Sequence, residues 1–374
     1  MVKKSIYMIV TLLTFVVSSV FAQLDTDKYK YYRVQNSKSL RYVSVRDGIG
    51  SINKSNYTAD FKAIDIISGI ENVISDPGSI IGIVDEGAGY YGLEAQGTSV
   101  AEIVSGVSII IVENEDGTYL VCGTAKGSKG GISGSGNAYL LDPGTGEDLS
   151  FIVSTAAGAR TKGTGNWKVY PVDSDDDSNY FGVDMNLYAE GKYYTTLYTS
   201  FAYTLSPDMT AYAISEVADG KVTLQDLGSY VPEETPVILE SSFSSASANR
   251  LQPVEGSGSV PGNLLSGVYF NHNRGGIHTV RTAFNKNSMR VLKVVDGEIT
   301  LSDEGDEFLP ANSAYLSVPA GTPSVLKFGV KTAIMEIQSD QDKTGRIYDL
   351  QGRQVRNPQQ KGVYIIDGKK VVGK

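Results

Sequence analysis

Asp-Gly pairs recur along this 374-residue chain, each between short segments in which apolar and polar residues alternate. Asp-Gly tolerates the positive φ angles of a type I′ turn, so each pair predicts a β-hairpin. Gly, Thr, Tyr and Val are plentiful, and no long segment has the apolar period of a helix. We therefore expect an all-β fold. The pairs are Asp116-Gly117, Asp219-Gly220, Asp296-Gly297 and Asp367-Gly368.

One segment departs from this pattern. From Asp60 to Ile74 apolar residues recur at every third position, behind Asp60 as a candidate N-cap. Asp76-Pro77-Gly78 then provides a stop signal. The spacing predicts a short helix over these residues, and Ser99 to Ser105 predicts a further turn or two.

The N-terminus has the pattern of a secretory signal peptide. Lys3 and Lys4 precede an apolar run, and small residues lead to Ala22. The run is shorter than the ~20 residues that cross a hydrocarbon core, and no later segment is apolar enough to do so. We expect export by Sec, cleavage after Ala22 and no transmembrane segment in the mature chain.

Composition excludes several classes of protein. One Cys cannot form an intramolecular disulfide, and two His with one Cys cannot supply the usual ligands of a structural zinc. Without residues 1–22 the chain keeps 31 basic and 42 acidic residues, a net charge of -11. Nucleic acid is therefore not an expected partner.

An internal repeat marks the middle of the chain. Residues 217–241 (VADGKVTLQDLGSYVPEETPVILES) match residues 294–318 (VVDGEITLSDEGDEFLPANSAYLSV), and Leu224 aligns with Leu301. Each copy predicts a hairpin, a Pro-bearing turn and a returning strand. Two facing copies would form a β-sandwich, in which each buries what the other exposes.

Composition shifts place the boundaries. An acidic run at 173–179 ends an N-terminal unit, and a polar linker follows the repeat. The expected organisation is a signal peptide (1–22), an N-terminal unit with a helical insertion (23–183), a β-sandwich (184–331), a linker (332–345) and a small C-terminal β module (346–374).

The C-terminal module carries a recognisable set of residues: Tyr348, Asp349, Leu350, Gly352, Arg353, Gly362, Tyr364, Ile365, Gly368, Lys369 and Lys374. In these residues it closely resembles the tails of many exported proteins of gram-negative gut and oral bacteria. In that family the tail is a small β module similar to the sorting domains recognised by type IX secretion machinery, which implies passage across the outer membrane to the cell surface. The alternative is a set of hairpins that packs on the preceding unit.

The other two units carry looser resemblances. Residues 193–214, 231–239, 263–267 and 309–316 look like the β modules that precede such tails. The N-terminal unit resembles the ricin-like β-trefoil family in residues 31–48, 117–127 and 166–183, with Asn-Trp where the ricin group has Gln-x-Trp. That resemblance implies a β-trefoil-like fold and leaves sugar binding open.

Signatures of common enzymes do not occur in the sequence. GxSxG, HExxH and the P-loop are missing, and we expect no enzyme. Ser51 and Lys54 satisfy Ser-x-x-Lys but lack partner motifs. Cys122 on a predicted strand is expected to be a buried apolar residue. His272 and His278 flank a Gly-Gly turn, where both could reach one metal.

The acidic run is the best metal candidate. Asp173, Asp175, Asp177 and Asn179 alternate, and Asp184 falls at the twelfth position, a spacing that suits the oxygen shell of Ca²⁺. A serine stands where the sharp turn of such a loop requires Gly. A solvated acidic loop without a cofactor is therefore the preferred interpretation.

Aromatic residues at predicted loops suggest a ligand site. A ring beside an amide or carboxylate suits a sugar, but tyrosines also finish sheet edges. For Trp167, alternation with Val169 favours core packing. The candidate ligand-binding residues are Trp167, Asn166, Asp173, Tyr90, Tyr91 and Tyr180.

These features predict a non-catalytic exported surface protein that binds a glycan or a host ligand through its N-terminal unit. The alternative is a structural or adhesive subunit that binds protein through sheet edges. The tail adds a possible partner, the type IX-like secretion machinery.

Overall fold

The computed structural model describes residues 24–47, 51–53, 58–60, 64–87, 89–99, 107–125, 138–146, 149–273, 279–332, 347–349, 363–366 and 369–372. Across these ranges the chain is nearly all β, as the turn signals predict. No helix among them is long and apolar enough to cross a bilayer. The expected signal peptide and nearly all of the expected linker lie outside the described residues.

The N-terminal unit is built around a closed ring of strands. Consecutive antiparallel pairs run from β1 to β6, β7, β9, β10, β13 and back to β1. Two further antiparallel pairs extend this ring: β2–β5 continues from β1, and β11–β12 continues from β10. The strands of this 11-stranded sheet are β1 Tyr31–Asn36, β2 Arg41–Val45, β5 Ile64–Ser68, β6 Ile81–Gly87, β7 Tyr90–Ala95, β8 Thr98–Ser99, β9 Val107–Glu113, β10 Tyr119–Ala125, β11 Ala138–Leu141, β12 Ser150–Val153 and β13 Trp167–Pro171.

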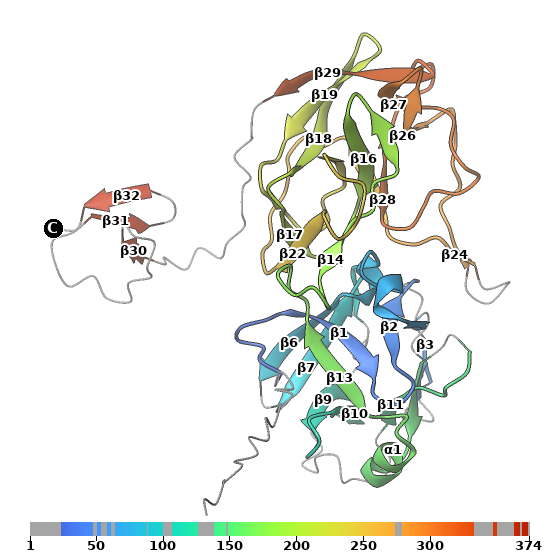
Figure 1. The fold of residues 1–374 in the computed structure, drawn as a ribbon, viewed down its shortest axis with the longest axis vertical. Coiled ribbons are helices and arrows are strands. Elements are labelled where there is room, and N and C mark those ends of the chain that lie inside the picture. The colour runs from blue at the N-terminus through green and yellow to red at the C-terminus, as the bar shows by residue number, and fades with distance from the viewer. Residues whose placement is uncertain are drawn as a thin grey trace, which may run out of the picture.

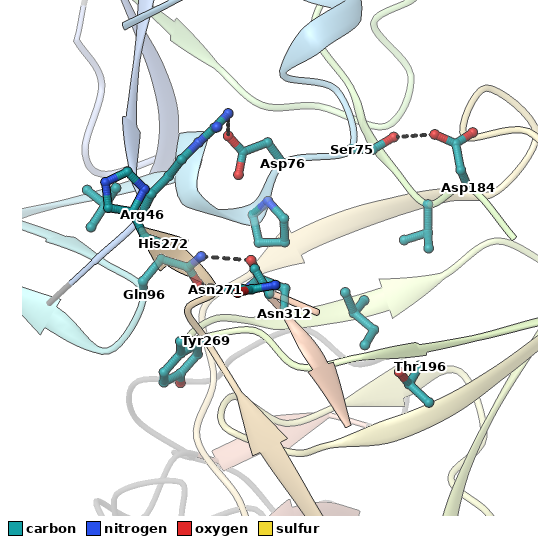
Figure 2. Close-up of a pocket in the computed structure, with 15 residues that line it drawn as sticks. Arg46, Ser75, Asp76, Gln96, Asp184, Thr196, Tyr269, Asn271, His272 and Asn312 are labelled. Carbon is teal, nitrogen blue, oxygen red and sulfur yellow. Dashed lines mark hydrogen bonds and ion pairs between the residues drawn. The ribbon is translucent and has the colours of Figure 1, made fainter. Parts of the chain in front are cut away.

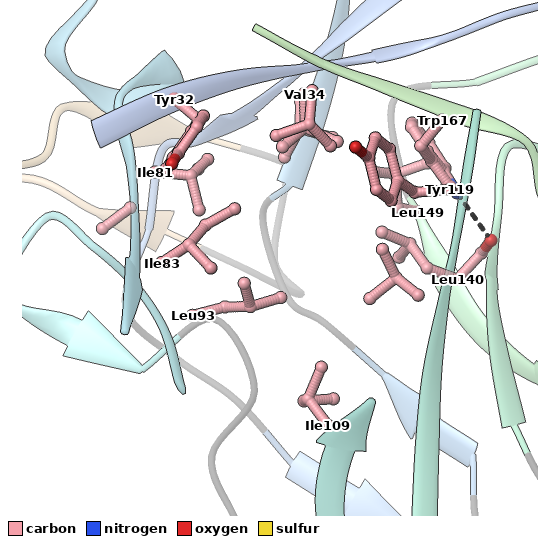
Figure 3. Close-up of a cluster of buried hydrophobic side chains, with 14 of the residues drawn as sticks. Tyr32, Val34, Ile81, Ile83, Leu93, Ile109, Tyr119, Leu140, Leu149 and Trp167 are labelled. Carbon is pink, nitrogen blue, oxygen red and sulfur yellow. Dashed lines mark hydrogen bonds between the residues drawn. The ribbon is translucent and has the colours of Figure 1, made fainter. Parts of the chain in front are cut away.

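Inward-facing residues of these strands form one apolar core (Figure 3), which includes Val34, Ile83, Tyr119 and Trp167. Period-2 alternation along each strand puts these residues on one face. The smaller elements of the unit are β3 Ser51–Asn53, β4 Thr58–Asp60, the 3-10 helices η1 Ile70–Asn72 and η2 Pro77–Ser79, and the helix α1 Ala156–Lys162.

The prediction of a helix from Asp60 to Ile74 is wrong. Ile64–Ser68 is strand β5, which pairs with all five residues of β2, and only the short η1 follows. β-Branched isoleucines favour a strand, and the pairing supplies the backbone hydrogen bonds that a helix would have provided. Most of the second expected helical segment, Ser99 to Ser105, lies outside the described residues, and Ser99 itself ends β8.

Two Asp-Gly pairs make the predicted turn. Asp219-Gly220 has φ angles of 50° and 71°, and Asp296-Gly297 has 51° and 85°, as a type I′ turn requires. At Asp116-Gly117 the strands β9 and β10 do form a hairpin, but only the glycine has a positive φ in its longer connection. Asp367-Gly368 lies outside the described residues, although the strands on either side pair.

In the part of the middle unit that the structure describes there are two sheets and one separate strand pair. A 4-stranded sheet joins β14 Phe181–Gly182, β22 Arg250–Val254, β17 Ala202–Leu205 and β20 Tyr230–Val231. A 10-stranded sheet has the order β15 Leu187–Ala189, β16 Lys192–Leu197, β21 Val237–Ser241, β18 Met209–Ala218, β19 Lys221–Asp226, β29 Val325–Thr332, β27 Glu298–Ser302, β26 Met289–Val295, β28 Ser313–Ser317 and β23 Leu265–Val268. A separate pair joins β24 His272–Asn273 to β25 Thr279–Val280.

The two copies of the repeat occupy matching places in the larger sheet. Read inward toward β29, the strands on one side are β16, β21, β18 and β19, and those on the other side are β23, β28, β26 and β27. The two sets are mirror images in their order. Leu224 and Leu301 are both fully buried and belong to one apolar cluster, so the copies share a core as the repeat predicts. The copies are joined through β29 within one sheet, which the sequence did not indicate.

The units stack end to end, and α1 lies at the end of the N-terminal unit away from the middle unit (Figure 1). At their junction Ile80 and Val172 join Phe201 and Tyr203 in a shared apolar cluster. Beyond the linker, β30 Ile347–Asp349, β31 Val363–Ile366 and β32 Lys369–Val372 form an antiparallel three-stranded sheet.

Candidate functional site

Two buried amides connect the units directly. Gln96 Nε2 donates to Asn312 Oδ1 at 2.9 Å, and Asn312 Nδ2 donates back to Gln96 Oε1 at 2.8 Å. Asn312 also donates to the carbonyl of Tyr198. Each amide thus meets a partner across the junction, which fixes the register of the two units.

The turn that carries Gln96 packs closely on the middle unit. Gln96 and Gly97 both have positive φ, 53° and 66°, in the two-residue turn between β7 and β8. A Cβ on Gly97 would lie 2.9 Å from Cε2 of Tyr269, whose ring stacks on Tyr198 at 4.3 Å between centroids. Glycine is therefore required here both by the backbone and by the close approach of the ring.

Beside this contact the two units enclose a cleft of about 410 Å³ (Figure 2). Polar and apolar surface contribute about equally to its wall. The polar side chains come from both units and from segments far apart in the sequence. The lining residues are Val45, Arg46, Ser75, Asp76, Pro77, Gln96, Val183, Asp184, Thr196, Leu197, Tyr269, Asn271, His272, Ala311 and Asn312.

An ion pair lies on the N-terminal side of the cleft. Arg46 Nη2 is 3.7 Å from Asp76 Oδ2, with 44% of the arginine side chain and 18% of the aspartate side chain exposed. Asp76 caps η2 by accepting from the Gly78 amide at 2.9 Å, and Ser44 Oγ donates to it at 2.5 Å. Burial raises the pKa of Asp76, while these hydrogen bonds and the charge of Arg46 oppose the rise.

A fully buried arginine supports the wall of the cleft from behind. Arg33 has no exposed surface and donates to Ser79 Oγ, to Asn179 Oδ1 and to the backbone carbonyls of Val73 and Tyr180. Burial lowers its pKa to about 10, so it stays charged at neutral pH. These bonds tie the segment that carries Asp76 to the boundary between the units.

The middle unit contributes Asn271 and His272 to the lining, and His272 lies near Arg46 in Figure 2. His272 is held by the short β24–β25 pair, where its backbone faces Val280. Its Nε2 is buried and has no hydrogen-bond partner among the described residues. Across the cleft, Asp184 accepts from Ser75 Oγ at 3.0 Å and from the Ala246 amide at 2.9 Å.

The structure places Trp167 in the core of the N-terminal unit. Its side chain has no exposed surface, and Nε1 donates to the Leu140 carbonyl at 3.0 Å (Figure 3). A ring with both faces packed cannot stack on a sugar, so the structure supports the packing interpretation. Neighbouring Asn166 is partly exposed and donates weakly, at 3.4 Å, to the Arg160 carbonyl.

The other predicted ligand-binding residues do not meet at one place. Tyr180 is buried, and the guanidinium of Arg250 lies over its ring at 4.2 Å. Tyr90 and Tyr91 are partly exposed on β7, and Tyr91 packs against the core of the ring. Asp173 accepts from the Asp175 amide within its own loop. None of these residues lines the cleft described above.

Several of the candidate calcium ligands have other partners. Asn179 accepts from Arg33 and donates to the Pro171 carbonyl at 2.7 Å, Asp177 pairs with Arg250 at 2.6 Å, and Asp184 lies in the cleft wall. Asp175 is exposed. Within the described ranges no three His, Cys, Asp or Glu residues are grouped as metal ligands.

The sequence also suggested catalytic or metal-binding roles to be weighed at Ser51, Lys54, Cys122, His272 and His278. Cys122 is buried, and burial raises the pKa of its thiol to about 12, which disfavours a nucleophile. His278 and Lys54 lie outside the described residues, and Ser51 begins β3. His272, considered above as a metal ligand, instead lines the cleft.

The cleft residues were missed because they meet only when the units pack together. Gln96 and Asn312 are 216 residues apart, and neither has a local signal beyond a turn. Amides, two carboxylates and a guanidinium together offer donors and acceptors to a polar molecule. A scan of protein-family models and searches of curated proteins and of solved structures find no match to this chain.

Proposed function

We propose that this chain is an exported, non-catalytic binding protein that holds a hydroxyl-rich ligand, such as a glycan, in the cleft between its first two units. The observation that carries the proposal is a cavity of about 410 Å³ whose wall combines apolar surface with polar side chains from both units. Arg46 and Asn271 can donate hydrogen bonds, and Asp76 and Asp184 can accept them. Sites of this size at a junction of units are common places for small ligands.

The fold supports the proposal by providing a rigid frame. A closed ring of strands with flanking antiparallel pairs supports a β-trefoil-like unit, and the shared core of the repeat supports a sandwich companion. Side chains at element ends, such as Arg46 after β2, then project from a fixed scaffold. The proposed site differs from the loop aromatics predicted from the sequence.

A glycan array tests this function on the mature full-length protein. Ala311 is exposed in the cleft wall, so Ala311→Trp should fill the cleft without removing any polar contact. Ala218→Trp, at an exposed position at the end of β18, is the matched control. We expect specific signals for the wild type and the control and their loss in Ala311→Trp.

Silence of the wild type across the array, or equal binding by Ala311→Trp, would contradict the proposed site. Silence together with self-association on sizing would favour the adhesive alternative. One observation supports that alternative, because edge strand β15 carries Tyr188 with 57% of its surface exposed.

Export and surface delivery belong to the same proposal. The signal-like N-terminus supports Sec export, and the resemblance of the tail supports a sorting role. Deletion of residues 347–374 should leave the protein in the periplasm with the first two units folded. Unchanged surface exposure of the deleted form, measured by protease accessibility on intact cells, would remove the sorting role.

A further inference from the structure

We infer that a second cavity at the junction of the first two units, lined by two aromatic rings and three glutamates, binds an organic cation, the alkylammonium or alkylguanidinium group of a ligand. This inference is independent of the proposed function, because no residue lines both the second cavity and the cleft.

The second cavity has a volume of about 330 Å³ and lies beside the turn that joins the units. Gly97 of that turn lines it, whereas the preceding Gln96 lines the cleft. Glu94 on β7 comes from the N-terminal unit, and Glu233 and Glu234, between β20 and β21, come from the middle unit. The site is therefore complete only when the two units pack together.

Carboxylates outnumber cations around this cavity. Lys30 Nζ pairs with Glu255 Oε1 at 3.0 Å, and Glu255, with 76% of its side chain exposed, does not line the cavity. The carboxylates of Glu94 and Glu233 form no hydrogen bond or ion pair with any residue that the structure describes. The described charged groups here are Lys30, Glu94, Glu233, Glu234 and Glu255. Two of the carboxylates are thus left to meet a charge that a ligand brings.

The buried Arg33 does not supply that charge. Its guanidinium donates to Ser79 Oγ, to Asn179 Oδ1 and to two backbone carbonyls. Its charge acts on Asp76, which lines the cleft and not the second cavity. The hydrogen bonds of Arg33 are therefore directed away from the glutamates.

The state of Glu233 agrees with an excess of negative charge. Burial raises its pKa, Glu234 and Glu94 raise it further, and Lys30 opposes the rise only in part. Glu234 accepts from the Tyr269 hydroxyl at 3.4 Å, a long bond that leaves its charge in place. A cation bound among these carboxylates would stabilise their ionised forms.

Apolar surface in the same cavity suits an organic cation better than a metal ion. Tyr31 and Phe201 both line it, with their ring centroids 5.5 Å apart. An alkyl stem can pack against these rings while its charged head donates to the carboxylates. Among the described residues the acidic side chains do not form a group that could hold a metal ion.

The test titrates the mature full-length protein with n-butylammonium, n-butylguanidinium, n-butanol and pentanoate, followed by saturation-transfer NMR. The two cations should bind, and the neutral alcohol and the anion should not. Glu233→Gln should weaken binding of the tighter cation roughly tenfold, the loss expected for a hydrogen bond to a charged group, and Glu94→Gln should weaken it as well. Glu216→Gln, at an exposed position of β18 outside the cavity, is the matched control and should bind like the wild type.

A peptide arm distinguishes the source of the cation. Tighter binding of acetyl-Gly-Lys-Gly-amide than of n-butylammonium would indicate a side chain of a protein partner, and the reverse would indicate a free amine. Either result supports the site.

A further measurement does not depend on any variant folding. Affinity of the wild type for the tighter cation should fall severalfold between about 0.05 and 0.5 M salt, because the attraction of the partly exposed carboxylates is screened. It should also fall between about pH 7 and pH 4, because protonation removes the carboxylate charges. Absence of binding by both cations, equal binding of n-butanol, or unchanged binding by both folded Glu233→Gln and Glu94→Gln would overturn the inference. None of these results bears on glycan binding in the cleft.

Discussion

Leu301→Ala is expected to lower the free energy of unfolding of the middle unit by about 2 to 5 kcal/mol. Leu301 on β27 has no exposed surface and lies in the cluster that draws residues from both copies of the repeat. Removing its side chain leaves a cavity that the β27–β26 and β27–β29 pairs on either side prevent from closing. In a unit of this size the loss corresponds to a fall in melting temperature of roughly 4 to 20 °C.

Leu264→Ala is the matched control, because Leu264 is 41% exposed and its truncation should change stability by less than about 0.5 kcal/mol. Urea unfolding followed by far-UV circular dichroism measures both. The single Trp167 reports the N-terminal unit separately by fluorescence. If Leu301→Ala lowers the free energy of unfolding as little as Leu264→Ala does, or if one repeat copy unfolds while the other stays folded, the shared core is refuted.

Three further changes test the junction and the N-terminal unit. Trp167→Phe should lower the free energy of unfolding by about 1 to 3 kcal/mol in urea titrations, since the indole hydrogen bond is buried, and should leave glycan binding on the array unchanged. Loss of glycan binding in a variant of unchanged stability would instead assign Trp167 to the ligand site. Gly97→Ala should lower both melting temperature and glycan binding by displacing Tyr269, whereas Gly191→Ala, at another left-handed turn with no atom within 4 Å, should keep binding. Burial raises the pKa of Asp142, but its hydrogen bonds outweigh burial and hold the pKa below its ordinary value. The ionised carboxylate therefore stabilises the folded state above about pH 4, and this stabilisation is lost as the pH falls through the pKa of the folded state. Thermal melts over this pH range should show a smaller loss of stability in Asp142→Asn than in the wild type.

Local chemistry predicted the turns well. Asp219-Gly220 and Asp296-Gly297 adopt the left-handed angles that the pair favours, because the preference resides in those two residues. The same turn at Glu190-Gly191, with φ of 53° and 81°, was not predicted, since glutamate is not a usual first residue there. Helix α1 also had readable signals, Thr155 as N-cap and Gly163 in a left-handed C-cap.

Non-local pairing explains the failures. The period of three at 60–74 suits a helix, but Ile64–Ser68 gains a full strand partner in β2, which a local pattern cannot show. The cleft is a stronger case of the same kind. Its walls come from turns and strand ends of two units, and no single segment carries a motif that would identify them.

Hydrogen exchange of the full-length mature protein, with and without the glycan that gives the strongest array signal, tests the joint site most directly. We predict slower backbone exchange on both sides of the cleft, at residues 45–47 and 75–78 of the N-terminal unit and at residues 269–273 and 311–313 of the middle unit. Protection confined to the N-terminal unit, for example around Tyr90 and Tyr91, would contradict the account.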